Sequence, residues 1–248
     1  MTEVTLHCGD ALEFLATLPD KSINAFLCDV PYGTTACTWD VIIPFAPMWE
    51  QVKRLLRPRG VFVTTASQPF TSKLVCSNLK LFKYCLVWDK GNSATGLHAD
   101  IMPMLVHEDI VVFGGGTYNP QMTLAKRRVD KRRHIPNGDA FSGGSAERIY
   151  DNNGENYPQS ILFLSNANQC GKNHPTQKPV ALYRYLTLTY TNPGDVVCDF
   201  AMGSGTTGAA CVPLGRDFIG CDIDQHWVDV SARRIAEAAA QEVMEFAK

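Results

Sequence analysis

The sequence lacks the features that mark membrane-spanning, secreted and zinc-stabilised proteins. No apolar run approaches the roughly 18 residues that a membrane-spanning helix needs. Residues 1–4 show no basic start before an apolar core, so we expect no signal peptide. The nine cysteines include no Cys-x-x-Cys pair, which disfavours structural zinc, and a disulfide framework is not expected in a chain this long. We therefore expect a cytoplasmic protein with mostly buried, reduced thiols and no bound metal.

A strong net charge is also missing. The formal net charge is -2, and charged residues make up 19% of the chain. A globally basic surface is therefore not expected, and any contact with nucleic acid must come from a local patch. The 248 residues are enough for one large α/β domain with an insertion, or for two small domains.

Short apolar runs alternate with helical stretches along most of the chain. This alternation predicts a mostly parallel sheet covered by helices on both faces. Residues 5–18 predict a short strand, a turn at Asp10 and a helix ended by Pro19. The other expected strands are 23–28, 61–65, 84–88, 109–113, 196–198 and 218–221, and the other expected helices are 48–56, 70–79, 180–190, 208–212 and 227–246.

The composition changes between residues 114 and 172, which are rich in Gly, Asn, Ser and charge. Only 160–164 reads as a strand there, and the segment is too long for an ordinary loop. We therefore expect an inserted recognition region in a domain formed by 1–113 and 173–248. Residues 126–134 hold six basic side chains that could contact phosphates, a solvated charged loop being the alternative. These are Lys126, Arg127, Arg128, Lys131, Arg132 and Arg133.

A glycine-rich turn, here called the glycine corner, follows the expected strand 196–198. Residues 199–206 read Asp-Phe-Ala-Met-Gly-Ser-Gly-Thr and lead into an Ala-rich helix. Glycines let a ligand approach the backbone, and the helix start offers free amides. Asp222, at the end of the next strand, is placed to bind ribose hydroxyls. No Lys follows Gly205, which disfavours a phosphate-binding loop, but Gly208 completes Gly-x-Gly-x-x-Gly, so a dinucleotide stays an alternative. A tight turn without a ligand is the other.

A second turn, here called the proline corner, follows the expected strand 23–28 and reads Asp29-Val30-Pro31-Tyr32. The Asp29 carboxylate and the Val30 carbonyl can both accept hydrogen bonds from an exocyclic amine, and the rigid Pro31 ring fixes their direction. Tyr32 offers a flat face on which a base could stack. Alone, such a stretch is most simply a capped turn. Together with the glycine corner it predicts a site where two substrates meet.

The two corners and three further stretches resemble the β-group of amino-group DNA methyltransferases, in which the catalytic motif precedes the motif for S-adenosylmethionine. Residues 29–32 are similar to that family's Asp-Pro-Pro-Tyr, and 199–205 to its Asp-Pro-Phe-x-Gly-x-Gly. The stretches 7–10, 174–179 and 218–224 match further motifs in the same order. The resemblance implies a Rossmann-like class I methyltransferase fold. Its sheet would have seven strands, mostly parallel with one antiparallel, in circularly permuted motif order.

The resemblance also implies roles for individual residues. Asp29, Val30, Pro31 and Tyr32 would form the catalytic motif, and Trp39 in the following loop could help to hold the target base. The implied cofactor contacts are Asp10 near the adenine, Asp222 on the ribose, Thr176 and Lys178 near the methionine end, and Asp29, Asp199, Phe200, Ala201, Gly203, Gly205 and Thr206 around them. Two departures stand out. Val30 replaces the first Pro, and Phe200-Ala201 replaces Pro-Phe, which puts the aromatic one place early.

The implied reaction is methyl transfer from S-adenosylmethionine to the N6 amine of adenine in a specific sequence of double-stranded DNA, after base flipping. The N4 amine of cytosine is a close alternative, although the cytosine enzymes usually begin this motif with Ser. Transfer to RNA or protein glutamine, a nicotinamide-dependent oxidoreductase and an inactive DNA-binding relative are further alternatives. The short insertion favours an enzyme without a companion nuclease, from a bacterium, phage or mobile element. Family members often dimerise, so a homodimer is one expectation.

Overall fold

The computed structural model of the chain describes residues 2–35, 37, 39–91, 96, 99–132, 148–166 and 177–246. Two compact units result, one formed by Met1–Asn119 with Ser160–Lys248 and a smaller one formed by Pro120–Gln159. Within the described ranges, no helix has the length and apolar character needed to cross a membrane.

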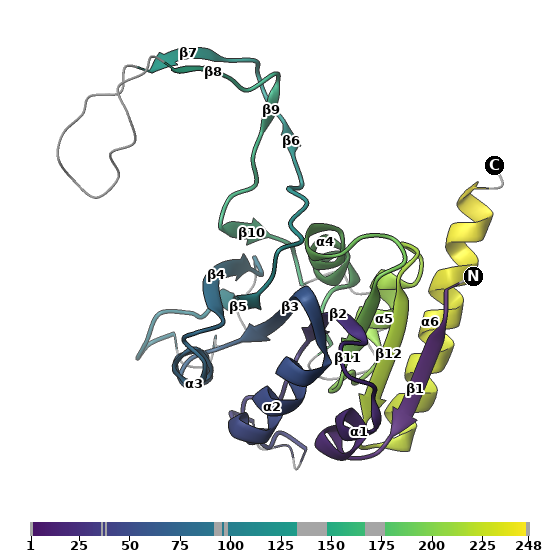
Figure 1. The fold of residues 1–248 in the computed structure, drawn as a ribbon. Coiled ribbons are helices and arrows are strands. Elements are labelled where there is room, and N and C mark those ends of the chain that lie inside the picture. The colour runs from purple at the N-terminus through teal and green to yellow at the C-terminus, as the bar shows by residue number, and fades with distance from the viewer. Residues whose placement is uncertain are drawn as a thin grey trace. The chain divides into compact units, whose positions relative to one another are not determined.

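The larger unit is built on one eight-stranded sheet (Figure 1). The strands, in spatial order, are β1 (Val4–Cys8), β12 (Asp217–Asp222), β11 (Val196–Asp199), β2 (Ile23–Cys28), β3 (Leu56–Ala66), β5 (His107–Gly114), β4 (Phe82–Asp89) and β10 (Ile161–Phe163). Strand β5 runs antiparallel to both of its neighbours, and all other neighbouring pairs are parallel. The expected α/β fold with one antiparallel strand is confirmed.

The strand count differs from the seven expected because β10 extends the sheet beyond β4. This strand comes from the stretch that the sequence assigned to the insertion. The smaller unit spans fewer residues than the expected insertion 114–172, because residues up to Asn119 and from Ser160 onward belong to the larger unit.

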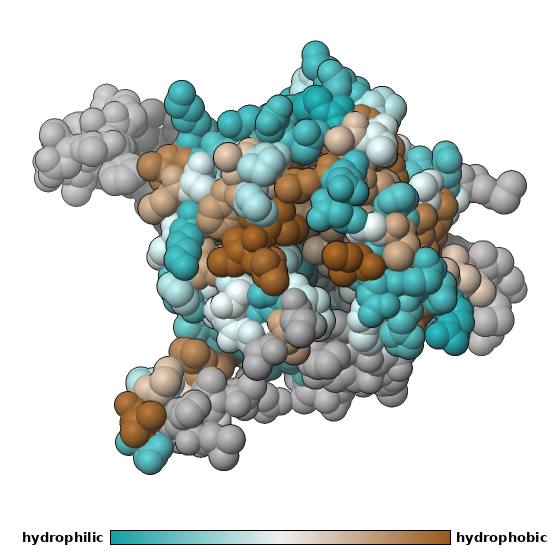
Figure 2. All heavy atoms as spheres, turned by 90° about the horizontal axis from the view of Figure 1, so that it is seen from below, coloured by the Kyte–Doolittle hydropathy of each residue, from teal (hydrophilic) through white to brown (hydrophobic). Residues whose placement is uncertain are grey.

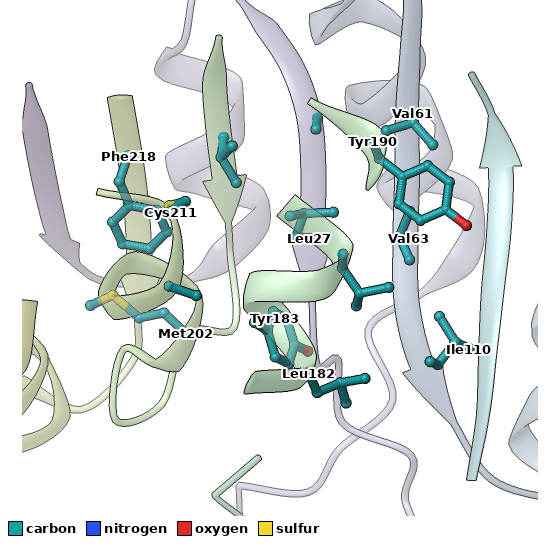
Figure 3. Packing of buried hydrophobic residues seen from close by; sticks show 14 of the residues in the cluster. Leu27, Val61, Val63, Ile110, Leu182, Tyr183, Tyr190, Met202, Cys211 and Phe218 are labelled. Carbon is teal, nitrogen blue, oxygen red and sulfur yellow. The ribbon is translucent and has the colours of Figure 1, made fainter. Parts of the chain in front are cut away.

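Helices cover both faces of the sheet. One face carries α1 (Ala11–Thr17), α2 (Phe45–Leu55) and α3 (Phe70–Ser77), and the other carries α4 (Val180–Tyr190), α5 (Thr206–Cys211) and α6 (Gln225–Phe246). Buried apolar side chains form one cluster under α1–α3, the first cluster, and another under α4–α6, the second cluster. Alternation along β2 explains this division, because Phe26 and Cys28 pack in the first cluster while Ala25 and Leu27 pack in the second. Figure 3 shows the second cluster, in which Leu27 lies among the side chains of the sheet and of α4.

The described cysteines are all free, but fewer are buried than the sequence predicted. Cys28, Cys198, Cys211 and Cys221 lie in the core, whereas Cys8, Cys37 and Cys76 are exposed.

The described residues of the smaller unit, Pro120–Gln159, form two short antiparallel strand pairs. Strand β6 (Thr123–Leu124) pairs with β9 (Glu155–Asn156), and β7 (Val129–Arg132) pairs with β8 (Arg148–Asp151). The sequence predicted no strand here, because these strands are short and rich in polar residues, so no apolar alternation marks them.

The four adjacent strands β1, β12, β11 and β2 are parallel, so their carboxyl ends lie along one edge of the sheet. Asp222 and Asp199 are the last residues of β12 and β11, and Asp10 and Asp29 closely follow β1 and β2. The sheet therefore lines up four carboxylates where open α/β sheets bind their ligands.

Candidate functional site

The proline corner is held by side-chain hydrogen bonds to Asp29. Its Oδ1 accepts hydrogen bonds from the hydroxyl of Tyr32, at 2.7 Å, and from the hydroxyl of Thr65. Its Oδ2 accepts one from Nζ of Lys178 at 2.7 Å. The Tyr32 ring stacks on Phe70 with ring centroids 5.2 Å apart. The carboxylate that the sequence singled out is therefore held from three sides at the end of β2.

The loop after Tyr32 is organised by the buried carboxylate of Asp40. The backbone N–H groups of Gly33, Thr34 and Thr35 donate to it at 2.7–2.9 Å. Burial alone would raise the pKa of Asp40, but these hydrogen bonds outweigh it and lower the pKa below its usual value. The preceding residue, Trp39, keeps 40% of its surface exposed. The loop thus presents an indole beside a rigid turn.

The glycine corner is held by backbone groups and by side chains together. Asp199 is buried, and it accepts hydrogen bonds from the Thr207 hydroxyl at 2.6 Å and from the Ala201 N–H at 3.1 Å. Burial raises the pKa of Asp199 to about 7, despite these hydrogen bonds. This carboxylate fixes the start of the turn from within the protein.

The two glycines of the turn have different reasons for being glycine. Both have positive φ, 50° at Gly203 and 74° at Gly205. A Cβ on Gly205 would lie 2.7 Å from Oγ of Ser231, whereas a Cβ on Gly203 would meet no described atom within 4 Å. The Gly203 N–H donates to Asp222 at 2.9 Å. Gly205 therefore allows close packing on α6, and Gly203 leaves open space beside the carboxylate of Asp222.

Phe200 remains a predicted cofactor contact, but its ring faces the core, so the contact would have to come from its backbone. Its ring is buried in the core, where it stacks on Phe62 with an interplanar angle of 8°. Phe200 continues the alternation of Val196 and Cys198, and all three pack in the same cluster. Ala201, one place later, is only half-buried.

The two corners are joined directly. Lys178, whose ammonium binds Asp29, accepts a hydrogen bond at its carbonyl from the Thr206 hydroxyl at 3.4 Å. Thr207 also bridges, since its hydroxyl lies 2.6 Å from Asp199 and 3.2 Å from the carbonyl of Leu27. The Asp29 carboxylate and the glycine turn therefore lie side by side, as a site for two substrates requires.

The remaining predicted cofactor contacts fall at the same edge or outside the described residues. Asp10 caps α1 by accepting hydrogen bonds from the N–H groups of Leu12 and Glu13, at 2.8 and 3.1 Å. Strand β1 pairs with β12 so that Cys8 lies opposite Asp222. Thr176 lies outside the described residues.

The basic cluster of the smaller unit is partly neutralised. Arg127 forms an ion pair with Asp151 at 2.6 Å, and Arg128 one with Asp130 at 2.8 Å. Both arginines remain largely exposed, as does Lys126. Lys131 and Arg132 lie on β7, where their side chains are not among those described, and Arg133 lies outside the described residues.

Three residues of the site were missed in the sequence: Thr65, Glu108 and Lys90. Lys90 forms an ion pair with Glu108 at 3.2 Å, and Glu108 lies 3.5 Å from Nζ of Lys178. Thr65 is the last residue of the expected strand 61–65, so the sequence could have placed it at the same sheet edge as Asp29. Glu108 could be placed only by knowing that its strand is the antiparallel one, which brings its beginning to this edge.

The edge where the parallel strands end has a mixed surface. In Figure 1 the arrowheads of β1 and β12 point downward, and Figure 2 shows the molecule from that side. Brown apolar side chains gather there among hydrophilic ones. Among the described residues, no group of three or more His, Cys, Asp or Glu side chains could hold a metal ion.

A doubly covered parallel sheet with a glycine turn, an acid at the next strand end and a second acidic corner beside it defines an α/β enzyme for a nucleotide-like ligand and a second substrate. The chain matches the model of the DNA methylase family designated N6_N4_Mtase over residues 26–233. It therefore belongs to this family. The expectation of a DNA methyltransferase is confirmed, and the oxidoreductase alternative is set aside.

Individual relatives agree with this assignment. The chain is 28% identical to the DNA adenine methyltransferase YhdJ of Escherichia coli K12 over 275 residues, covering 98% of this chain and 86% of the relative. The solved complex of M1.HpyAVI with SAM is similar with a TM-score of 0.61 at 23% identity, covering 93% of this chain and 99% of that one. The cytosine-N4-specific PvuII DNA methyltransferase gives 0.68 at 16% identity, covering 98% and 93%. These two structural likenesses establish the fold.

Proposed function

We propose that this protein transfers a methyl group from S-adenosylmethionine to the N6 amine of adenine in a specific sequence of double-stranded DNA. The observation that carries the proposal is the placement of Asp29 at a strand end directly beside the glycine corner, to which Lys178 joins it. The curated relative YhdJ is named as an adenine methyltransferase, which supports adenine as the target. The motif at 29–32 also begins with Asp, whereas the N4-cytosine enzymes usually begin it with Ser.

The glycine corner fits S-adenosylmethionine. The free space at Gly203 lets a ligand approach the backbone, and Asp222 beside it can accept hydrogen bonds from ribose hydroxyls. Asp10, at the end of the neighbouring strand, is exposed and can face the adenine part. When bound, this cofactor supplies an electrophilic methyl group. The residues of the protein need only hold it beside Asp29.

The proline corner fits an exocyclic amine. The Asp29 carboxylate and the Val30 carbonyl would accept its two N–H hydrogens, which directs the nitrogen lone pair toward the methyl group. The new N–C bond would form as the C–S bond breaks, which leaves a neutral thioether. Asp29 would stabilise the positive charge that develops on nitrogen, until the methylated nitrogen loses one proton to solvent. The amine must leave the base stack to reach this edge, so the target base is flipped, and Tyr32 with Trp39 would hold it.

The smaller unit would supply the DNA contacts that carry no chemistry. Exposed Lys126, Arg127 and Arg128 can reach phosphate oxygens, which would make DNA affinity fall as salt rises. The ion pairs with Asp151 and Asp130 would orient the arginines in the free protein, and would open or be shared when phosphates arrive.

The N4 amine of cytosine is the second candidate, since the PvuII enzyme has the same fold. Transfer of tritium from labelled S-adenosylmethionine to DNA, followed by digestion and chromatography of the nucleosides, separates the two. We expect label in N6-methyladenine. Label in N4-methylcytosine would replace adenine by cytosine, and unlabelled DNA would overturn the proposed function. Sequencing of modified bases in DNA from expressing cells would then give the recognition site.

A further inference from the structure

We propose that Glu108 is a positioning residue for methyl transfer, which draws the ammonium of Lys178 away from Asp29 so that this carboxylate can accept the target amine. The inference rests on the proposed function, because it concerns how the same site receives its second substrate. The inference is based on two carboxylates, Asp29 and Glu108, that compete for the buried ammonium of Lys178.

The first step is that Asp29 has little accepting capacity left. A carboxylate offers about two acceptor positions on each oxygen. Oδ1 already accepts from the hydroxyls of Tyr32 and Thr65, so an incoming amine must approach Oδ2. That oxygen holds Lys178 at 2.7 Å. Asp29 therefore has one acceptor position left, and that position is on the oxygen that already holds the ammonium.

The second step concerns charge. Methyl transfer places positive charge on the amine nitrogen, and an ammonium on the same carboxylate oxygen would oppose it. The side chain of Lys178 is only 9% exposed, so water screens this repulsion poorly. Burial by itself would lower the pKa of Lys178, but Asp29 and Glu108 outweigh it and raise the pKa, so the lysine stays charged at neutral pH. Relief must come from movement rather than from loss of a proton.

The third step is that an acceptor for the moving ammonium is already in place. Oε1 of Glu108 binds Lys90 at 3.2 Å, while Oε2 is buried and has no hydrogen-bond partner among the described residues. This oxygen lies 3.5 Å from Nζ of Lys178, at the limit of hydrogen-bond reach. A shift of well under 1 Å would convert the contact into a charge-assisted hydrogen bond. Lys90 fixes Glu108 so that the acceptor does not follow the lysine toward Asp29.

The principal test is Glu108→Gln, which keeps the shape of the side chain but removes the charge that attracts Lys178. With enzyme in excess over an adenine-containing duplex, we expect the single-turnover rate of methyl transfer to fall about tenfold or more, with unchanged affinity for S-adenosylmethionine. The matched control is Asp109→Asn, because Asp109 is the next residue on β5 and binds the Thr71 hydroxyl rather than a lysine. We expect the control to keep the wild-type rate. Equal losses in both variants would overturn the inference.

A double-mutant cycle tests whether Glu108 acts through Lys178. In a Lys178→Met background, Glu108→Gln should change the rate less than about twofold, because the cation that it positions is gone. The same tenfold loss in both backgrounds would mean that Glu108 acts on something else, and would overturn the inference.

A readout without turnover separates this inference from the proposed function. In protein with nitrogen-15-labelled lysine, the side-chain ammonium signal of Lys178 is identified by its loss in Lys178→Met. Glu108→Gln should move that signal and Asp109→Asn should not. An unmoved signal overturns the inference even in an active enzyme. A wild-type protein that methylates no adenine overturns the proposed function, while the signal still decides whether Glu108 holds Lys178.

Discussion

The proline corner and the glycine corner lie on the same sheet edge but are built in opposite ways. At the proline corner, Asp29 is half-buried and bound by three side chains, one of them a cation. At the glycine corner, Asp199 is fully buried, and the turn is fixed by two glycines with positive φ, by backbone groups and by the buried Thr207 hydroxyl. The partners of a half-buried carboxylate can exchange, whereas a buried and tightly packed turn stays in place. The difference agrees with the proposed function, in which the incoming amine replaces a side-chain partner at the proline corner, while the glycine corner would bind S-adenosylmethionine on a preformed turn.

The largest expected effect comes from removing the Asp29 carboxylate of the proline corner. Asp29→Ala should reduce methyl transfer by about 10²–10³-fold, because the amine loses its main acceptor and the developing charge loses its counter-ion. Binding of S-adenosylmethionine, measured by titration, should persist, since the glycine corner is intact. Asp29→Asn is the control for shape, and it should remain strongly impaired. Turnover near the wild-type rate in either variant would contradict the role of Asp29.

The next largest effect should come from adding a side chain to either glycine of the glycine corner. Gly205→Ala should destabilise the fold by about 1–3 kcal/mol, because the residue has a φ of 74° and its Cβ would meet Ser231 at 2.7 Å. Gly203→Ala has free space for its Cβ, so it should cost only the strain of its own φ, about 1–2 kcal/mol, and act mainly by weakening cofactor binding. Urea unfolding measures the first effect and cofactor titration the second. Identical profiles for the two variants would show that the glycines are not distinct.

Much of this comparison could be predicted from the sequence, because both corners follow short apolar runs that predict buried strands. The residues that connect them could not. Lys178 was expected at the cofactor, but its bond to Asp29 depends on how the segment before α4 returns to β2, 149 residues away in sequence. Glu108 depends on the direction of β5. The direction of the Phe200 ring could not be predicted, because a motif gives residue order, while the direction of a side chain follows from strand alternation.

The strand pairs of the smaller unit were missed for a related reason. Strand β7 reads Val-Asp-Lys-Arg and β8 reads Arg-Ile-Tyr-Asp, and neither shows the alternation that marks a half-buried strand. Of the apolar side chains described on these two strands, Val129 and Tyr150 are both exposed. The composition of the same segment predicted the basic cluster, but it did not predict that Asp130 and Asp151 form ion pairs with that cluster.

A smaller effect, on stability, should show that the Asp199 carboxylate is buried at a cost. Its pKa rises from 3.8 to about 7 on folding, so the folded state keeps a proton that the unfolded chain has lost between those values. The contribution of Asp199 to stability therefore falls as pH rises from about 4 to 7. Asp199→Asn removes the titration, and should raise the melting temperature relative to wild type more at pH 8 than at pH 5. A pH-independent difference between the two proteins would contradict the raised pKa.

The smallest effect should come from one hydroxyl of the proline corner. Tyr32→Phe removes the 2.7 Å hydrogen bond to Asp29 but keeps the ring that stacks on Phe70. Burial, together with the neighbouring Asp29, raises the pKa of Tyr32 well above its usual value, so the hydroxyl is a donor throughout the working range. Because Thr65 still donates to the same oxygen, we expect the single-turnover rate to fall only about three- to tenfold, the value of one hydrogen bond of about 1 kcal/mol. A loss as large as that of Asp29→Ala would mean that the Tyr32 hydroxyl contacts the reacting amine itself rather than only holding the carboxylate.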